Sequence, residues 1–206
     1  MKSGIDISHH QGGINFCDLV TDFVIIKCGG FENGKFYIDS MYERNYIGCK
    51  AHNIKIGIYY YIDNSINEYN LLSIVSHILS LIKDKKFDLP FYIDCETSLK
   101  ERKEEVTELL IEVAKQIESK KYYVGFYGSS VSVFKDRLNL NKLKDRFTLW
   151  VADYNGDVNY VPKEYVDMRQ VTSNGKKTGI NGYVDFNELY NENLITVIHN
   201  KKFNNN

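Results

Sequence analysis

Strand-like and helix-like segments alternate along the first half of this 206-residue chain, and this alternation limits the fold more than any other feature. Repeated β–α units imply parallel strands joined by right-handed crossovers, in a doubly wound sheet or a barrel. The second half adds strands whose connections are too short for full helices. We expect strands at residues 3–8, 23–29, 55–63, 89–96, 122–129, 148–154, 166–173 and 184–187. Eight strands favour the barrel: a single-domain α/β fold, an irregular TIM-like barrel with eight strands and fewer helices.

Three helices of useful length are expected in the first half, each preceded by a serine with a glutamate three residues on. This spacing is typical of a capping box. The pairs are Ser40 with Glu43, Ser65 with Glu68, and Ser98 with Glu101. A single domain is assigned to residues 1–199. Residues 200–206 form a polar C-terminal tail that we expect to be frayed.

The composition excludes several classes of function. Lys and Arg number 26 and Asp and Glu 27, so no basic face for nucleic acid is expected. No run of apolar residues is long enough to insert into a membrane. The N-terminus lacks the apolar segment of a signal peptide, so we expect a protein made in the cytoplasm. The four cysteines show neither a C-x-x-C pair nor zinc spacing, and we interpret them as reduced, packed thiols.

The segment L-P-F-Y-I-D-C-E at residues 89–96 carries the strongest functional signal. Alternation along a strand places Asp94 and Glu96 on one face, about 6–7 Å apart at the backbone, and Cys95 on the other. Asp6 and Asp185 lie in the first and last expected strands. In a barrel, active residues come from the C-terminal ends of several strands, so these four acids are expected to meet.

Clustered carboxyl groups raise one another's pKa, so that one stays protonated while another is ionised. Glycoside hydrolysis needs such a pair. The alternative is that Asp94 and Glu96 cap the next helix or pair with a lysine such as Lys27. His9 and His10 are not expected to bind a metal, because no histidine lies at ligand spacing from the acids. No cofactor is expected.

The ordered motifs D-I-S-H-H-Q-G, F-V-I-I-K, G-I-Y-Y-Y, L-P-F-Y-I-D-C-E, G-F-Y-G-S, L-W-V-A-D-Y and Q-V-T-S-N-G-K-K-T-G-I-N-G-Y-V-D-F-N resemble those of the family-25 glycoside hydrolases. These are the Chalaropsis-type lysozymes, or muramidases, of bacteria, fungi and phage endolysins. The resemblance covers residues 4–189. It implies an irregular eight-stranded barrel. It also implies hydrolysis of the β-1,4 bond between N-acetylmuramic acid and N-acetylglucosamine in peptidoglycan, the expected partner.

The resemblance also implies roles for individual residues. Glu96 would be the general acid, and Asp94 would assist the substrate acetamide, which itself attacks the anomeric carbon. Asp6 and Asp185 match the family's other two site acids. The groove would be lined by Tyr59, Tyr61, Tyr127, Tyr154 and Gln170. Two departures stand out: Arg169 replaces an aromatic residue, and Cys28, Gly29 and Gly30 follow Lys27 where the family has a small residue and an acid.

Two alternatives of different kinds stay open. One is a chitinase-like enzyme or endo-N-acetylglucosaminidase, although residues 89–92 lack the further upstream acid of those motifs. The other is a non-catalytic cell-wall-binding protein. Without a signal peptide, a wall hydrolase would act after release through a phage holin or through lysis. The spacing of Asp94 and Glu96 falls between the retaining and inverting ranges and does not decide the stereochemistry.

Overall fold

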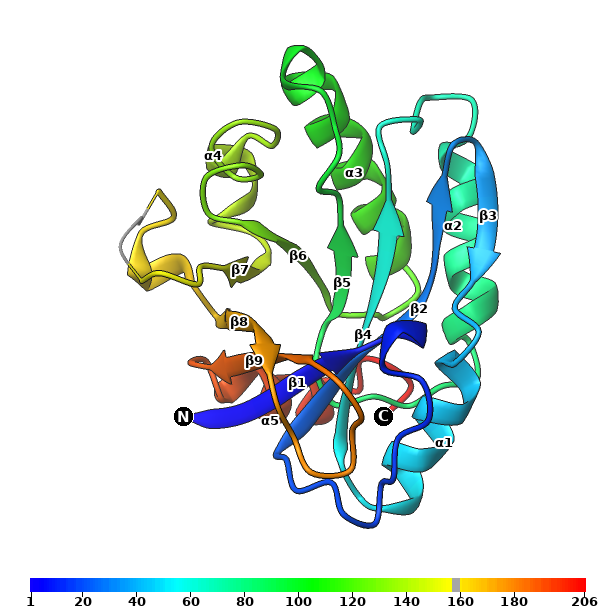
Figure 1. The fold of residues 1–206 in the computed structure, drawn as a ribbon. Coiled ribbons are helices and arrows are strands. Elements are labelled where there is room, and N and C mark those ends of the chain that lie inside the picture. Colours follow the sequence, from blue (N-terminus) through cyan, green and yellow to red (C-terminus); the bar gives the residue numbers. More distant parts are fainter. Residues whose placement is uncertain (157–159) are drawn as a thin grey trace.

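Eight strands close into a barrel in the computed structural model, which describes residues 1–156 and 160–206 (Figure 1). Around the barrel the order is β1, β2, β4, β5, β6, β7, β8 and β9, and β9 returns to β1. The strands are β1 (Lys2–Ile7), β2 (Phe23–Glu32), β4 (Lys55–Ile62), β5 (Phe91–Asp94), β6 (Val124–Ser129), β7 (Thr148–Ala152), β8 (Met168–Gly175) and β9 (Val184–Leu189). The prediction of an irregular eight-stranded barrel is confirmed.

The barrel is mixed rather than fully parallel. β9 runs antiparallel to both β8 and β1, because only residues 176–183 connect it to β8. A parallel return would need a crossover of a dozen or more residues. A ninth strand, β3 (Lys35–Ile38), was not predicted. It pairs antiparallel with β2 alone and lies outside the barrel.

Helices cover the barrel unevenly, as expected. The long ones, α1 (Tyr42–Ala51), α2 (Leu71–Ile82) and α3 (Lys103–Glu118), follow strands of the first half (Figure 1). The second half has the single turn α4 (Leu140–Leu143) and the C-terminal α5 (Asn193–Asn200), which was not predicted. One turn of 3₁₀ helix occurs at each of His9–Gln11, Lys100–Arg102 and Lys163–Tyr165. Within the described ranges, no helix is both long and apolar enough to cross a membrane.

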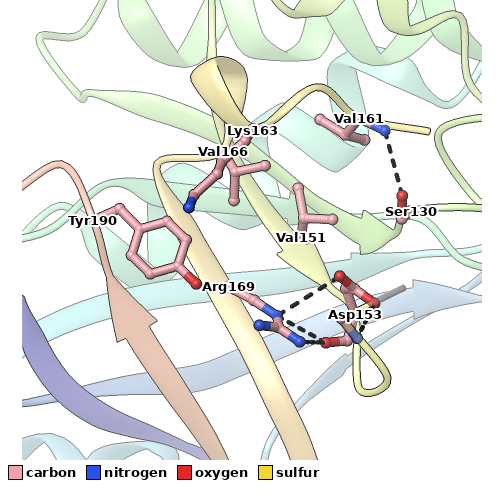
Figure 2. A pocket seen from close by; sticks show the side chains of 9 residues that line it. Ser130, Val151, Asp153, Val161, Lys163, Val166, Arg169 and Tyr190 are labelled. Atoms are coloured by element: carbon pink, nitrogen blue, oxygen red, sulfur yellow. Dashed lines mark hydrogen bonds and ion pairs between the residues drawn. The ribbon is translucent and has the colours of Figure 1, made fainter. Parts of the chain in front are cut away.

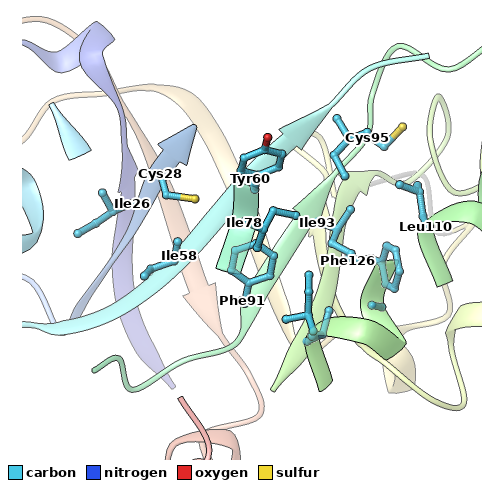
Figure 3. Close-up of a cluster of buried hydrophobic side chains, with 14 of the residues drawn as sticks. Ile26, Cys28, Ile58, Tyr60, Ile78, Phe91, Ile93, Cys95, Leu110 and Phe126 are labelled. Carbon is cyan, nitrogen blue, oxygen red and sulfur yellow. The ribbon is translucent and has the colours of Figure 1, made fainter. Parts of the chain in front are cut away.

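The strand wall separates two apolar clusters. Outside it, Ile93 and Cys95 of the β5 segment pack with Ile78 of α2 and Leu110 of α3 (Figure 3). Inside it, Tyr92 contacts Trp150 with ring centroids 5.3 Å apart. The predicted alternation along β5 is therefore confirmed, with odd positions toward the helices and even positions toward the barrel interior.

Glycine makes room for aromatic rings inside the barrel. A Cβ at Gly125 would lie 2.7 Å from the Tyr92 ring and would overlap Thr148. A Cβ at Gly4 would overlap the Phe23 ring. The interior is thus filled by large rings set against strand positions without side chains.

All three predicted capping boxes are wrong. The helices begin at Tyr42, Leu71 and Lys103, and none has a side-chain hydrogen bond from its N-cap residue. Ser65 bonds the Asp63 carboxylate and accepts from the Gly34 N–H instead, so its hydroxyl ties two loops together. Conversely, an unpredicted capping box joins Ser8 and Gln11 around the 3₁₀ turn after β1.

The C-terminal residues are held in place, so the expectation of a frayed tail is wrong. Asn204 is fully buried, accepts from the Tyr123 N–H at 2.9 Å and donates to the Leu89 carbonyl at 2.9 Å. Asn205 donates to the Lys83 carbonyl at the end of α2. Asparagine side chains satisfy backbone groups at the barrel bottom, which composition alone does not reveal.

Candidate active site

Four acids gather at one rim of the barrel: Asp6, Asp94 and Glu96 come from the C-terminal ends of parallel strands, whereas Asp185 lies near the N-terminal end of the antiparallel β9. Asp6 of β1 lies directly opposite Asp185 of β9 in the antiparallel pair. Asp94 is the last residue of β5, and Glu96 follows two residues later. The charges of Glu96 and Asp6 act on Asp94, and that of Asp185 acts on Glu96, so the four form one electrostatic unit. We call Asp6, Asp94, Glu96 and Asp185 the acid cluster.

Asp6 and Asp185 form a hydrogen-bonded pair inside the barrel rim. Asp6 Oδ2 accepts from Asn187 Nδ2 at 2.8 Å and from Gln170 Nε2 at 2.9 Å. Burial, followed by the Asp185 charge, raises the pKa of Asp6 to about 8. Burial also raises the pKa of Asp185, and its hydrogen bond with Asp6 lowers it. The two carboxyl groups therefore share one hydrogen bond, and the higher pKa of Asp6 favours the proton on that residue.

Asp94 is buried without comparable support. The residue is only 4% exposed, and its carboxyl oxygen Oδ1 has no hydrogen-bond partner among the described residues. Burial and then the Glu96 charge raise the pKa of Asp94 well above its usual range, while Lys27 lowers it. A buried carboxyl oxygen without a partner is rare in folded proteins and requires an explanation.

Glu96 lies just beyond the strand and is the acid most open to solvent. Partial desolvation by the surrounding strand ends raises its pKa. The Asp185 charge raises it further, and Lys27 and Arg137 lower it. Neither Glu96 nor Asp94 caps a helix or forms an ion pair with Lys27 in the described part of the chain. The structural alternative for these two acids is therefore wrong.

Gln170 lies beneath the acid cluster rather than on an open surface. The residue is 1% exposed, and its amide bonds four side chains. Oε1 accepts from Tyr127 and Tyr154, both at 2.8 Å, and Nε2 donates to Asp6 and to Asp185, the latter at 3.1 Å. Of the predicted groove residues, Tyr127 is buried and Tyr154 is 49% exposed.

The other two predicted tyrosines surround a lysine. Lys27 Nζ lies 5.7 Å from the Tyr59 ring centroid, 5.2 Å from that of Tyr61 and 5.7 Å from that of Tyr37. The Tyr61 hydroxyl also bonds Thr97 at 2.9 Å. Cation–π contacts of this kind stabilise a protonated amine beside the acid cluster.

An open cleft adjoins the acids on this side. It encloses about 350 Å³ and is lined by His9, His10, Lys27, Glu32, Tyr37 and Tyr61. Tyr61 pairs in register with Asp94, which places the cleft beside β5. His9 Nδ1 lies 2.7 Å from buried Asp39, which holds the loop after β1. Among the described residues, no group of three or more histidine, cysteine or acidic side chains could hold a metal ion.

Sequence reasoning missed three residues of the site. Tyr37 comes from the unpredicted β3, and its ring lies against Gly30, where any side chain would overlap it. Trp150 and Asn187 support the acids from below: the indole N–H donates to Asn187 Oδ1 at 2.8 Å, and Asn187 bonds Asp6. The i, i+2 spacing of Asp185 and Asn187 on one strand was the available signal.

Arg169 occupies the outer side of the barrel, next to a separate cavity of about 190 Å³ (Figure 2). Its guanidinium donates to the Asp153 carbonyl at 2.6 and 2.8 Å. The neighbouring Gln170 bonds Tyr154 from the inner side. The residue that departs from the family pattern therefore fixes the loop that carries Tyr154.

The four cysteines are free thiols. Cys28, Cys49 and Cys95 are buried, as expected, whereas Cys17 is exposed rather than packed. Burial raises the pKa of Cys95 to about 12, which leaves this neighbour of the acids protonated and unreactive.

Comparison with known proteins supplies the family. A model of the glycosyl hydrolases family 25 matches residues 5–180. The autolytic lysozyme of Clostridium acetobutylicum is 28% identical over 186 residues, which is 90% of this chain and 55% of that protein. This chain thus spans about half the length of that curated relative.

Solved structures share the fold. A bacterial lysozyme from Streptomyces coelicolor matches with a TM-score of 0.79 and 21% identity, covering 97% of each chain. The catalytic domain of endolysin ply40, from bacteriophage P40 of Listeria monocytogenes, matches with a TM-score of 0.79 and 21% identity, covering 96% of this chain and 97% of that one.

Proposed function

This chain belongs to family 25 of the glycosyl hydrolases, and on that premise we propose that it is an N-acetylmuramidase. Its substrate would be bacterial peptidoglycan. The bond cleaved would be the β-1,4 linkage between N-acetylmuramic acid and N-acetylglucosamine. The observation that carries the proposal is the acid cluster, in which carboxyl groups on one rim have contrasting surroundings.

Glu96 is the proposed general acid. Its raised pKa favours the protonated form, and its exposure allows it to reach the glycosidic oxygen of a bound sugar. Protonation of the leaving oxygen is what this step requires. Asp185 and Asp6 lie below the rim. The negative charge of this pair raises the pKa of Glu96 and so favours its protonated form.

Asp94 is proposed to assist the substrate acetamide. Its buried Oδ1 has no partner among the described residues, so an acetamide N–H from the substrate would satisfy it. An acetamide oriented in this way can attack the anomeric carbon, and then no carboxylate nucleophile is needed. This division of roles leaves Asp94 to orient and Glu96 to transfer the proton.

The open cleft and the exposed ring of Tyr154 lie on different sides of the acid cluster and would hold sugars of the glycan strand. Tyrosine suits this purpose because its flat apolar face packs on a sugar ring and its hydroxyl remains wet. We propose Tyr59, Tyr61, Tyr127 and Tyr154 as lining residues. The wall would be reached after release of the protein from the cell.

Glu96→Gln tests the proposal directly. The amide keeps the shape but cannot donate the proton, so we expect clearing of cell-wall suspensions to fall by roughly 10²-fold or more. Glu68→Gln is the matched control, since Glu68 is exposed, precedes α2 and is not part of the acid cluster. Full activity of Glu96→Gln would contradict the assignment.

Product analysis separates the alternatives. New reducing ends on N-acetylmuramic acid support the proposal. Reducing ends on N-acetylglucosamine, or turnover of soluble chitin oligomers, would point to the chitinase-like alternative. Binding to purified peptidoglycan without any turnover would indicate a wall-binding protein.

A further inference from the structure

We propose that Gln170 is a positioning residue that sets the charge on the Asp6–Asp185 pair and, through it, keeps the proton on Glu96. This inference rests on the function proposed above. It assigns Gln170 a role beneath the groove instead of contact with the substrate.

The amide of Gln170 has no free hydrogen-bonding position. A side-chain amide offers two donors and two acceptor lone pairs. Here the two Tyr hydroxyls occupy the oxygen and the two carboxyl groups occupy the nitrogen. The orientation follows from chemistry, because an ionised carboxylate only accepts and must face the NH₂ group. Because these hydrogen bonds occupy its whole amide and the residue is only 1% exposed, Gln170 has no free group with which to bind a sugar.

The backbone of Gln170 is held as firmly as its side chain. Its carbonyl accepts from the Asp153 N–H at 3.0 Å, and Arg169 clamps the Asp153 carbonyl from the outer face. The start of the loop after β7 is therefore held against β8 from both faces of the barrel wall. The amide cannot rotate away from the acids without breaking contacts to Tyr127 and Tyr154.

Two N–H donors stabilise negative charge on the pair. Asp6 retains the shared proton because it is the more deeply buried acid, and Asp185 carries the charge. That charge acts on Glu96 and favours its protonated form. Gln170 thus influences the proton donor, Glu96, indirectly through the charge of Asp185.

Other charged and titratable groups lie around the acid cluster and act on the same carboxyl groups as Gln170. Lys27 on β2 and Arg137 after β6 oppose Asp185 at Glu96. Asp94 on β5 faces both Glu96 and Asp6. The tyrosines that face the acids come from β4, from β6 and from the loop after β7: Tyr59, Tyr61, Tyr127 and Tyr154.

Gln170→Met and Gln170→Glu test the inference, with Gln116→Met and Gln116→Glu on α3 as matched controls. Methionine keeps the shape and removes every hydrogen bond. We expect kcat/KM for wall hydrolysis to fall about tenfold or more. We also expect the alkaline limb of the pH profile to move to lower pH by roughly 0.5–1 unit, because Asp185 loses charge and Glu96 releases its proton sooner.

Gln170→Glu adds a third carboxyl group to the pair. Protonated glutamic acid restores one donor, so we expect activity to recover only at acidic pH. This variant also keeps the test decisive if Gln170→Met fails to fold. A pH profile that keeps its position in both variants, with only a lower rate, would overturn the inference and leave Gln170 a structural residue.

Carboxyl titration by ¹³C NMR separates this inference from the proposed function. In Gln170→Met we expect the pKa of Asp185 to rise and that of Glu96 to fall, whether or not the protein cleaves walls. Unchanged carboxyl titrations in Gln170→Met would overturn the inference even if the parent is an active muramidase. An inactive parent with the expected titration shifts would overturn the muramidase assignment alone.

Discussion

The two halves of the acid cluster are built in opposite ways. On the Asp6–Asp185 side, both carboxyl groups accept hydrogen bonds from side-chain amides, and the chain of contacts extends through Asn187 to the buried Trp150. On the Asp94–Glu96 side, one buried oxygen has no partner among the described residues and one carboxyl group faces solvent. The first half is organised before any ligand arrives, and the second is left for the ligand to complete.

A large effect, second only to that of Glu96→Gln, is expected from Asp94→Asn, which changes the open half alone. Activity on walls should fall by roughly 10²-fold, because the acetamide loses the carboxylate that orients it. Stability should hold or rise, since a neutral amide replaces a buried carboxyl group that lacks support. Parallel measurements of wall clearing and thermal midpoint check both parts. A variant that loses stability together with activity would contradict the contrast between the halves.

The second prediction concerns the closed half and pH. Asp6 has a pKa of about 8 in the fold and an ordinary value near 3.8 when unfolded. The folded state therefore binds the extra proton between these values, so stability should fall as pH rises from about 4 to about 8. The slope from one proton is at most about 1.4 kcal/mol per pH unit.

Asp6→Asn sharpens this second test. Asparagine mimics protonated Asp6, since its NH₂ can donate to Asp185 and its oxygen can accept from Gln170. The variant should fold, and its chemical unfolding curves should depend less on pH across this range. A slope equal to that of the parent would show that another group carries the proton. Asp22→Asn serves as the control, because Asp22 is exposed, accepts from the Ser3 N–H and forms no ion pair within the described part of the chain.

The placement of residues at the strand ends was predictable because it depends only on interactions within each segment. Alternation assigns Asp94 to the interior and Cys95 to the helices, and parallel strands bring Asp6 and Asp94 to one rim. Each step needs only the residues of one segment and the class of the fold. The same reasoning could not reach Tyr37, whose strand pairs outside the barrel, or the C-terminal asparagines, whose partners lie more than eighty residues away.

An irregularity in the backbone of β2 explains another feature that the sequence analysis did not predict. The pairing of β2 with β4 shifts between Lys27 and Gly29, so Cys28 is an extra residue in the strand. A bulge of this kind changes which residues share a face, and period-two reasoning fails beyond it. Of the two glycines that follow, Gly30 makes room for the Tyr37 ring and Gly29 for the Tyr37 carbonyl. The departure from the family pattern at this point thus shapes the open cleft.

A moderate effect is expected from Trp150→Phe. The change removes the indole N–H from buried Asn187 and leaves an acceptor unsatisfied, at a cost of about 1–3 kcal/mol in the free energy of unfolding. Urea unfolding followed by circular dichroism measures it, because the chain has one tryptophan and the variant lacks tryptophan fluorescence. An unchanged free energy of unfolding would mean that the closed half does not depend on this contact.

The smallest effect is expected from Lys27→Met, and its direction distinguishes the two halves. Lys27 lowers the pKa of both Asp94 and Glu96 and reaches them from the open side, whereas Asp185 raises that of Glu96 from the closed side. Removing the lysine charge should therefore move the alkaline limb of the wall-hydrolysis profile to higher pH, by less than about one unit. Gln170→Met should move it the other way. Lys35→Met, on exposed β3, should leave the limb in place. If Lys27→Met and Gln170→Met moved the limb in the same direction, Glu96 would not be balanced between the two halves, and a single charge would control its proton.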